Sequence, residues 1–276
     1  MHTLTANGAN IPALGLGTWE LRGDTCSHIV EQAVRGGYTH IDTAIMYDNE
    51  TAVGAGIRAS GVARDDLFVT TKVWPTDVTE ASFLNAVEGS LRRLEMDAVD
   101  LLLIHWPPKT PEPTVWAHLL NSAADRGLTR NIGVSNFNIA QINAMVAASE
   151  RPIACNQVEN HPYLDQRRLR AACAANGIAL IAYCPIYRGG PMFEEPAVLQ
   201  AAATHAKTPA QIVLRWHVQH GGAGAIPKTA TPGRLVENKA IFDFALSDSE
   251  MAAITALTSA NKRLCDFEFS PVWDAA

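Results

Sequence analysis

The chain contains 276 residues, of which 47% are hydrophobic and 18% are charged; this is typical of one large α/β domain, predicted here over residues 1–276. A formal net charge of −6, without a long basic run, excludes the electrostatic footprint of a nucleic-acid or anionic-membrane partner. No apolar run reaches the roughly 18 residues of a spanning helix, and the first residues lack a signal-peptide pattern, so a cytoplasmic protein is expected.

Cysteine and histidine spacing gives no indication of a disulfide framework or a metal site. The cysteines are odd in number and never spaced as CxxC. His217 and His220 lie three residues apart in a helical pattern, but no third ligand accompanies them, so no metal is predicted. The five cysteines are Cys26, Cys155, Cys173, Cys184 and Cys265.

Eight short apolar runs, rich in leucine or β-branched residues, alternate with helical patterns. Alternation implies parallel strands joined by helical crossovers, and eight such units match a closed (β/α)₈ TIM barrel. An open, doubly wound sheet is the alternative. The predicted strands are 14–18, 39–44, 67–73, 99–105, 130–135, 153–159, 178–184 and 224–228, and the predicted helices include 27–37, 80–94, 166–177 and 197–206.

Further elements are predicted at both ends of the barrel. Asn7 and Gly8 separate two short segments and predict a tight N-terminal hairpin that closes the barrel floor. Ser247 and Glu250 form a capping box, which predicts an extra C-terminal helix. An irregular tail, residues 262–276, follows this helix.

Four ionisable residues stand where apolar strands turn polar. Asp42 and Tyr47 follow the second strand, Lys72 ends the third, and His105 ends the fourth. The carboxyl ends of barrel strands share one rim, where such folds carry their chemistry. These four residues are therefore expected to be neighbours at a catalytic rim.

Such a set can protonate a developing alkoxide. A phenol ionises near pH 10, and an adjacent ammonium lowers that pKa, so Lys72 is expected to activate Tyr47. Lys72 itself needs Asp42 as a counter-charge to stay protonated among apolar strand residues. His105 could donate to a carbonyl oxygen beside the phenol or orient it.

Each of the four residues also has a simpler interpretation. Asp42 and Lys72 could form a structural ion pair, Tyr47 could only cap a helix entry, and a lone histidine such as His105 is more often structural than catalytic. Placement on three successive strand ends favours the catalytic interpretation of the set.

Carbonyl reduction requires a hydride source, but the GxGxxG fingerprint is absent, since the glycine-rich stretch 15–20 lacks its third glycine. Segment 226–238 follows the eighth strand and opens a helix, with Thr231 as predicted N-cap. A helix N-terminus attracts anions, and Lys228 and Arg234 add two positive charges suited to a 2′-phosphate. NADPH is therefore predicted over NADH.

Aromatic residues near the predicted rim suggest an apolar substrate slot. Such a slot favours small or aromatic carbonyl compounds without naming one. Its predicted walls are Trp19, Trp74 and Trp106, which follow rim residues of three strands, together with Phe267, Phe269 and Trp273 from the tail.

With these residues identified, the chain resembles the aldo-keto reductase superfamily from end to end. Its compact length and C-terminal sequence are most similar to the small bacterial branch that includes the 2,5-diketo-D-gluconate reductases, which also reduce methylglyoxal and other aldehydes. The resemblance rests on 37–50, 69–74, 101–107, 131–137, 156–164 and 226–238, which occur in the family's order and spacing.

The resemblance implies a role for each matching residue. Asp42, Tyr47, Lys72 and His105 match the family's catalytic tetrad. The implied cofactor residues are Ser135, Asn136 and Gln157 at the nicotinamide carboxamide, Tyr183 stacked on its ring, Lys228, Thr229 and Arg234 at the 2′-phosphate, and Glu237 and Asn238 at adenine, with Gly17, Thr18, Asp42 and Cys184 completing the expected set.

One position departs from the family pattern. The family commonly has serine after the stacking tyrosine, where this chain has Cys184. We interpret Cys184 as a small packing residue. The alternative is a reactive thiol with Arg188 as its cationic neighbour.

The expected function is NADPH-dependent reduction of aldehydes or ketones, such as 2-oxoaldehydes, keto sugars or aromatic aldehydes, by a monomer with Tyr47 as general acid. One alternative is a nucleotide-binding protein with little turnover, against which the intact tetrad argues. Another is a barrel aldolase that uses Lys72 as a Schiff base. A lysine paired with Asp42 stays protonated and is a poor nucleophile, which argues against it.

Overall fold

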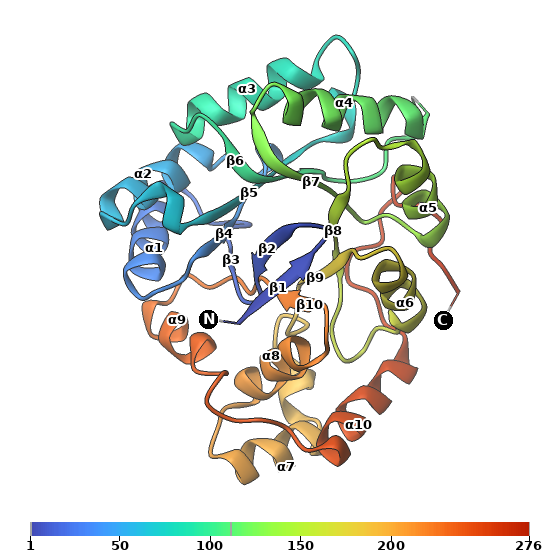
Figure 1. Cartoon of the computed structure of the whole chain (residues 1–276). Coiled ribbons are helices and arrows are strands. Elements are labelled where there is room, and N and C mark those ends of the chain that lie inside the picture. Colours follow the sequence, from blue (N-terminus) through green and yellow to red (C-terminus); the bar gives the residue numbers. More distant parts are fainter. Residues whose placement is uncertain (1, 111, 276) are drawn as a thin grey trace.

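The computed structural model describes residues 2–110 and 112–275 and contains a parallel sheet surrounded by helices (Figure 1). Within the described residues this sheet has eight strands in chain order from β3 to β10. Its strands are β3 (Leu16–Gly17), β4 (His40–Asp42), β5 (Phe68–Val73), β6 (Val99–Ile104), β7 (Thr129–Ser135), β8 (Ile153–Glu159), β9 (Ala179–Tyr183) and β10 (Ala223–Ala225).

The first and last strands meet and close the barrel. A parallel bridge joins Leu14 to Ala225, and the N–H of Gly15 donates to the Ala225 carbonyl at 2.9 Å. A Cβ on Gly17 would lie 2.7 Å from the Ile226 carbonyl oxygen, so this contact requires glycine. The closed (β/α)₈ barrel is confirmed, and the doubly wound alternative is wrong.

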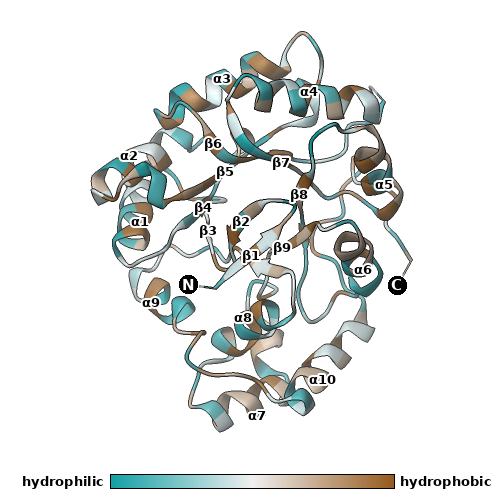
Figure 2. Ribbon diagram, viewed as in Figure 1, coloured by the Kyte–Doolittle hydropathy of each residue, from teal (hydrophilic) through white to brown (hydrophobic). Residues whose placement is uncertain are grey.

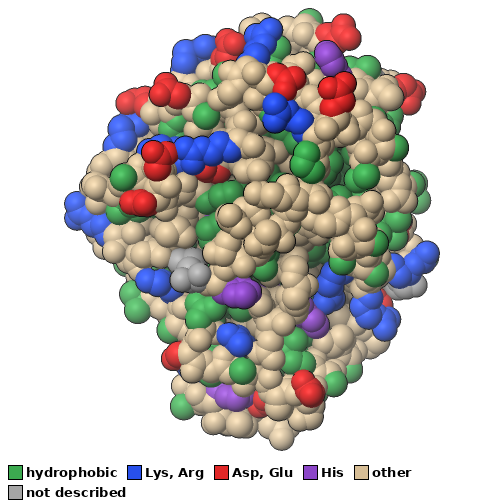
Figure 3. Space-filling model, viewed as in Figure 1, with side chains coloured by type: hydrophobic (Ala, Val, Ile, Leu, Met, Phe, Trp, Pro, Cys, Tyr) green, Lys and Arg blue, Asp and Glu red, His purple; other side chains and the backbone are tan. Residues whose placement is uncertain are grey.

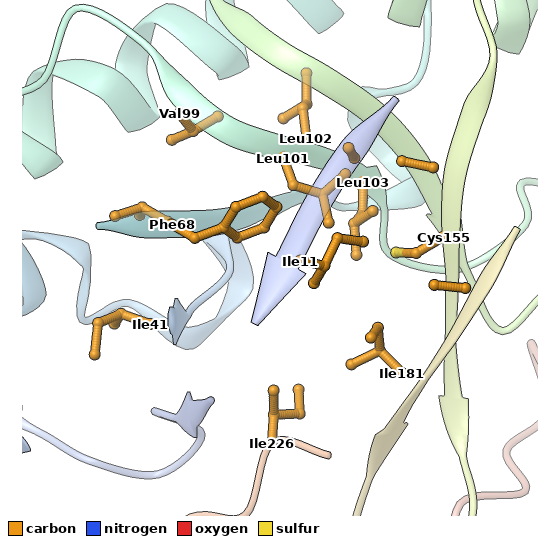
Figure 4. Close-up of a cluster of buried hydrophobic side chains, with 14 of the residues drawn as sticks. Ile11, Ile41, Phe68, Val99, Leu101, Leu102, Leu103, Cys155, Ile181 and Ile226 are labelled. Carbon is orange, nitrogen blue, oxygen red and sulfur yellow. The ribbon is translucent and has the colours of Figure 1, made fainter. Parts of the chain in front are cut away.

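The predicted N-terminal hairpin is present and covers one mouth of the barrel. Strands β1 (Thr3–Ala6) and β2 (Ala9–Pro12) pair antiparallel around Asn7 and Gly8, which both have positive φ. The hairpin lies in front of the barrel strands in Figure 1. In Figure 4, Ile11 of this hairpin points into the barrel interior, and the barrel floor is therefore packed and not open.

Strand β6 shows why the barrel strands read as continuous apolar runs. Every residue from Val99 to Ile104 is buried, because a parallel sheet in a barrel is covered on both faces. Side chains alternate along the strand. Leu101 and Leu103 point toward Ile11 in the interior, whereas Leu102 points the other way, toward the helices (Figure 4).

Helices follow the strands and form the outer ring, with hydrophobic residues turned toward the sheet (Figure 2). Helix α3, for example, buries Val87, Leu91 and Leu94 and leaves Arg92 and Arg93 exposed. The helices are α1 (Gly23–Arg35), α2 (Glu50–Ser60), α3 (Phe83–Leu94), α4 (Pro113–Asp125), α5 (Ile139–Ala148), α6 (Arg167–Ala175), α7 (Pro196–His205), α8 (Pro209–Gln219), α9 (Pro232–Lys239) and α10 (Asp248–Ala256).

The predicted C-terminal helix is α10, and it begins with the predicted capping box. The Ser247 side chain accepts from the Glu250 N–H, and the Glu250 carboxylate accepts from the Ser247 N–H. Helices α7, α8 and α10 share a second apolar cluster, which includes Trp216 and Ile254, beside the main core (Figure 1). The tail then leaves α10 and runs back to the barrel rim.

The outer surface carries charges of both signs. Lys and Arg side chains are interspersed with Asp and Glu on the hairpin side of the molecule (Figure 3). In the part of the chain that the structure describes, no helix is long and apolar enough to cross a membrane. Over the same residues, no group of three or more His, Cys, Asp or Glu side chains could hold a metal ion.

Candidate active site

The four predicted catalytic residues come together at the carboxyl ends of β4, β5 and β6. Asp42 is the last residue of β4, and Tyr47 ends the short 3-10 helix Ile45–Tyr47 that follows it. Lys72 lies near the end of β5, and His105 directly follows β6, with its N–H donating to the Val73 carbonyl. The rim arrangement expected from the sequence is therefore present.

A buried ion pair forms the base of the site. Nζ of Lys72 lies 2.5 Å from Oδ1 of Asp42, and the two side chains are 0% and 1% exposed. The same ammonium donates to the Thr43 carbonyl at 2.9 Å and to the Tyr47 phenol at 3.4 Å. The three N–H bonds of Lys72 thus connect the phenol to the carboxylate.

The pKa of Lys72 is raised, and this fits a permanent cation. Burial lowers the pKa of Lys72, but the Asp42 carboxylate and the Tyr47 phenol outweigh that effect. A lysine held protonated is a poor nucleophile, which argues against a Schiff-base aldolase.

The pKa of Tyr47 is raised, whereas the sequence analysis expected Lys72 to lower it. Burial raises the pKa of Tyr47, and the Lys72 ammonium lowers it only in part, because the Asp42 carboxylate lies close behind that ammonium and raises it again. The expectation of a lowered phenol pKa is wrong. The phenol therefore keeps its proton at neutral pH, as a proton donor must.

His105 faces the phenol from the neighbouring strand. The ring centroids of His105 and Tyr47 are 5.5 Å apart, and Trp74 packs edge-on to the same imidazole at 5.3 Å. Burial and the Lys72 ammonium hold the pKa of His105 well below its usual value, so the imidazole is neutral. Among the described residues its buried Nδ1 has no hydrogen-bond partner.

A second group of polar residues lines the ends of β7, β8 and β9. The Tyr183 phenol donates to Oδ1 of Asn136 at 2.8 Å, and Nδ2 of Asn136 donates to the His105 carbonyl at 3.0 Å. The Ser135 hydroxyl donates to the Gln157 carbonyl at 2.8 Å. Asn136 has φ of 65°, a left-handed conformation that asparagine tolerates better than most residues.

Gln157 connects the two groups across the barrel. Its Nε2 donates to Oδ2 of Asp42 at 2.6 Å. Asp42 therefore accepts a hydrogen bond from Lys72 on one oxygen and from Gln157 on the other, and these two bonds fix the orientation of the carboxylate. The predicted nicotinamide residues and the predicted catalytic residues form one continuous network.

The predicted 2′-phosphate residues lie near the start of α9, away from the tetrad in sequence. Lys228 and Arg234 are exposed, and Nζ of Lys228 is 3.9 Å from a carboxylate oxygen of Glu20. Thr231 is the N-cap and Pro232 follows it, as predicted, but in the described chain its side chain makes no capping bond. The first turn of α9 thus lies beside two exposed cations, at the helix end that attracts anions.

The remaining predicted cofactor residues have structural partners of their own. Glu237 accepts from the Thr208 hydroxyl at 2.6 Å, and Asn238 is buried. Thr18 is buried, and its hydroxyl donates to the Asp42 carbonyl at 3.0 Å. Gly17 is explained by barrel closure alone, so its place in a cofactor site stays a prediction.

The aromatic residues of the predicted slot lie together beside the tetrad. Trp19 packs on Tyr47 with ring centroids 4.9 Å apart, and it is 38% exposed. The tail returns to this rim, as expected. Its contacts are Phe269 with Trp74 at 5.5 Å, and Phe267, Phe269 and Trp273 with Trp106 at 5.8, 5.2 and 6.0 Å.

Two supporting residues escaped the sequence analysis. Asn49 accepts from the Thr43 hydroxyl at 2.8 Å and donates to the Thr18 carbonyl at 2.8 Å, which braces the loop that carries Tyr47. Glu159, which is fully buried at the end of β8, accepts from the N–H groups of Leu264 and Cys265 in the tail. A carboxylate at a buried strand end was the signal that could have revealed Glu159.

Comparison with known proteins shows that the chain belongs to the aldo/keto reductase family. A model of the aldo/keto reductase family matches residues 13–259. The chain is 42% identical over 252 residues to a glyoxal reductase of Bacillus subtilis, covering 91% of this chain and 90% of that protein. It is 41% identical over 261 residues to methylglyoxal reductase DkgA of Yersinia pestis, covering 94% of this chain and 92% of that one.

A solved structure supports the same family assignment. A crystal structure of a candidate 2,5-diketo-D-gluconic acid reductase B is 43% identical and superposes with a TM-score of 0.97, covering 100% of this chain and 98% of that one. The predicted resemblance to this bacterial group is therefore confirmed.

Proposed function

Because the chain belongs to the aldo/keto reductase family and is an oxidoreductase that acts on carbonyl groups, we propose that it reduces small aldehydes and ketones with NADPH, using Tyr47 as the proton donor. Family members use NAD(P)H in general. The observation that carries the proposal is the bond from the Lys72 ammonium to the Tyr47 phenol, at the mouth where His105 and the rim tryptophans converge.

The residues at the rim fit a nicotinamide dinucleotide. When bound, the reduced cofactor supplies a hydride to the carbonyl carbon of the substrate. Ser135, Asn136 and Gln157 offer hydroxyl and amide groups for its carboxamide, and Tyr183 offers an aromatic face beside them. Cys184 follows Tyr183 and completes this side of the proposed site.

The start of α9 fits the phosphate that distinguishes NADPH from NADH. Lys228 and Arg234 are exposed cations next to a helix N-terminus without a side-chain cap among the described residues. Positive charge at a helix N-terminus favours a 2′-phosphate over a ribose hydroxyl. Thr229 belongs to the same proposed contact, and Glu237 and Asn238 on α9 are the proposed adenine contacts.

The proton path follows from the tetrad geometry. The substrate oxygen is placed between the Tyr47 phenol and the His105 imidazole, where both can direct a hydrogen toward it. As negative charge develops on that oxygen, the phenol gives up its proton, and the Lys72 ammonium stabilises the resulting phenolate. Asp42 holds Lys72 in its charged form.

The slot above the tetrad sets the substrate class. Its proposed walls are aromatic, which suits 2-oxoaldehydes such as methylglyoxal, keto sugars and aromatic aldehydes. Two relatives carry glyoxal and methylglyoxal reductase names, which favours the first of these classes. The proposed substrate residues are Trp19, Tyr47, Trp74, His105, Trp106 and Trp273.

The test is an absorbance assay of NADPH consumption by the purified chain. Substrates are methylglyoxal, diketogluconate, substituted benzaldehydes and a β-keto ester, each with NADPH and with NADH. The proposal expects turnover with at least one class, faster with NADPH, and alcohol formed in equal amount to cofactor oxidised. A folded, NADPH-binding protein that consumes no cofactor with any of them would contradict it. Light scattering during the same work tests whether the enzyme is a monomer.

A further inference from the structure

A buried carboxylate behind the tetrad connects the supports of the proposed proton donor and its lysine. Glu50 is the first residue of α2, three positions after Tyr47, and its side chain is 0% exposed. Its Oε1 accepts from the Thr71 hydroxyl at 2.6 Å. Thr71 directly precedes Lys72 on β5. Glu50 therefore joins the segment that carries the phenol to the strand that carries the ammonium.

Thr71 and Lys72 lie on opposite faces of β5. Side chains alternate along a strand, and all six residues of this strand are buried. Nζ of Lys72 donates to Asp42 inside the barrel. The Thr71 hydroxyl instead meets Glu50 of α2 and Ser90 of α3, in the ring of helices. The bond to Glu50 thus holds β5 from the outside and leaves the inner face to the tetrad.

The segment between β4 and α2 is fastened to β5 at both of its ends. At its start, the N–H of Thr43 donates to the Thr70 carbonyl at 2.9 Å. At its end, Glu50 accepts from the Thr71 hydroxyl. Tyr47 lies between these two points, which reach consecutive residues of β5. The position of the phenol relative to β5 is therefore set by two short hydrogen bonds.

Both oxygens of the Glu50 carboxylate are held in place. The Ser90 hydroxyl also donates to Oε1. Oε2 accepts from Nε of Arg93 at 2.8 Å and lies 2.6 Å from Nη2 of the same guanidinium. A buried carboxylate needs such partners to offset its lost hydration, and charge-assisted bonds to arginine restrict its orientation. Glu50 is therefore a fixed point between α2, α3 and β5.

Asp100 offers an internal comparison with the same chemistry at the other end of the strands. Its buried carboxylate lies 2.7 Å from Arg64 and 3.0 Å from Arg130, and it accepts from the Val69 N–H at 2.8 Å. Val69 is near the start of β5, away from the rim. A carboxylate that only stabilises the fold should behave alike at both ends, so the contrast between Glu50 and Asp100 separates positioning from stability.

We propose that Glu50 is a positioning residue for carbonyl reduction, which sets the separation between the Tyr47 phenol and the lysine ammonium through its bond to Thr71. The inference rests on the proposed function, in which that ammonium stabilises the phenolate. The phenol lies 3.4 Å from Nζ of Lys72, at the long end of a hydrogen bond, so a small shift of β5 breaks the contact. A misplacement of about 1 Å can cost roughly a hundredfold in rate.

The kinetic test compares two matched pairs of variants, using NADPH and the carbonyl compound that wild type reduces best. Glu50→Gln and Thr71→Val remove the carboxylate or the hydroxyl, and kcat is expected to fall by roughly tenfold, while KM and the Kd for NADPH stay within about twofold. Asp100→Asn should lower the melting temperature and keep kcat. Thr71→Ser retains the hydroxyl and should restore kcat to within about twofold of wild type.

A second readout does not require turnover. With tyrosine labelled with carbon-13 at Cζ, the Tyr47 resonance is identified by its absence in Tyr47→Phe, and its chemical shift reports the hydrogen bonding of the phenol. This resonance should move in Glu50→Gln and Thr71→Val, and stay in place in Asp100→Asn and Thr71→Ser. Should wild type reduce no carbonyl compound, the proposed function fails, and the resonance still decides whether Glu50 positions the phenol.

The result that would overturn the inference is a wild-type Tyr47 resonance in folded Glu50→Gln and Thr71→Val. A loss of kcat in Asp100→Asn equal to that in Glu50→Gln would overturn it as well, because the effect would then follow from stability alone. Circular dichroism checks that each variant is folded. Thr71→Val, which exchanges a hydroxyl for a methyl group, keeps the test decisive if Glu50→Gln does not fold.

Discussion

The phenol oxygen of Tyr47 lies 3.4 Å from the ammonium nitrogen of Lys72, at the rim of a closed barrel. That contact joins the proposed proton donor to a buried ion pair in which Lys72 and Asp42 are almost fully enclosed. The chemistry and the stability of this site are therefore coupled, and variants of the pair affect both.

The ion pair predicts a non-additive stability effect. Lys72→Met leaves the Asp42 carboxylate buried without its counter-charge and is expected to cost about 3–5 kcal/mol of unfolding free energy. Adding Asp42→Asn should recover part of this loss, because the buried charge is then removed. Urea unfolding of the two single variants and the double variant measures the coupling. Losses that simply add would show that the pair is not coupled.

The pH dependence of turnover follows from two pKa directions. Burial raises the pKa of Tyr47, so the acid form persists to the alkaline side of the usual phenol range near 10. Burial and Lys72 hold the pKa of His105 well below its usual value, so the imidazole stays neutral as pH falls through 6.5. We expect a flat kcat profile from about pH 6.5 to 9, with loss only above it. An acid limb centred near pH 6.5 would contradict the neutral His105.

The proposed phosphate contact predicts a cofactor-selective defect. Lys228→Met combined with Arg234→Ala removes two cations and should weaken NADPH binding by about a hundredfold or more, while NADH binding changes little, because only NADPH carries the phosphate. Fluorescence titration with both cofactors measures this. Arg126→Ala, which removes an exposed arginine at the C-cap of α4, is the matched control. Equal losses for NADPH and NADH would count against the phosphate site.

The tail predicts a dependence on substrate size. Truncation after Asn261 also removes the two N–H donors of the buried Glu159, so it is expected to lower the melting temperature. Truncation after Cys265 keeps those bonds and deletes the aromatic wall, together with the bonds from Val272 and Asp274 to the start of α5. The shorter deletion should raise KM for bulky aromatic aldehydes and leave KM for methylglyoxal nearly unchanged, with NADPH affinity intact. A similar rise for both substrate sizes would refute the role of the tail as a wall.

The sequence predicted most of the barrel and the tetrad because those features are local. Apolar runs alternating with helical patterns define parallel strands, and a polar residue at the end of such a run must lie at the rim. Asp42, Lys72 and His105 satisfied that rule on successive strands. Strand ends were predicted less well: β3 is only Leu16–Gly17, within a predicted 14–18, since tertiary pairing decides where a ladder stops.

Contacts between residues far apart in the chain, and the direction of the pKa shift of a buried group, could not be predicted from the sequence. The bond from the Leu264 N–H to Glu159 spans 105 positions, and no local pattern encodes it. The pKa of Tyr47 depends on how deeply the phenol is buried, and the charge of Lys72 alone indicated the wrong direction. Thr231 occupies the predicted N-cap, but within the described residues its hydroxyl caps nothing, because cap geometry depends on side-chain rotamers.

The central claim is tested most directly by Tyr47→Phe, which deletes the phenolic proton and preserves the ring that packs on Trp19 and His105. Steady-state kinetics with methylglyoxal and NADPH, together with NADPH titration, give both readouts on one variant. The account predicts that kcat falls by roughly a hundredfold to ten-thousandfold while the Kd for NADPH stays within about twofold of wild type. Turnover at the wild-type rate in a folded Tyr47→Phe protein would contradict it.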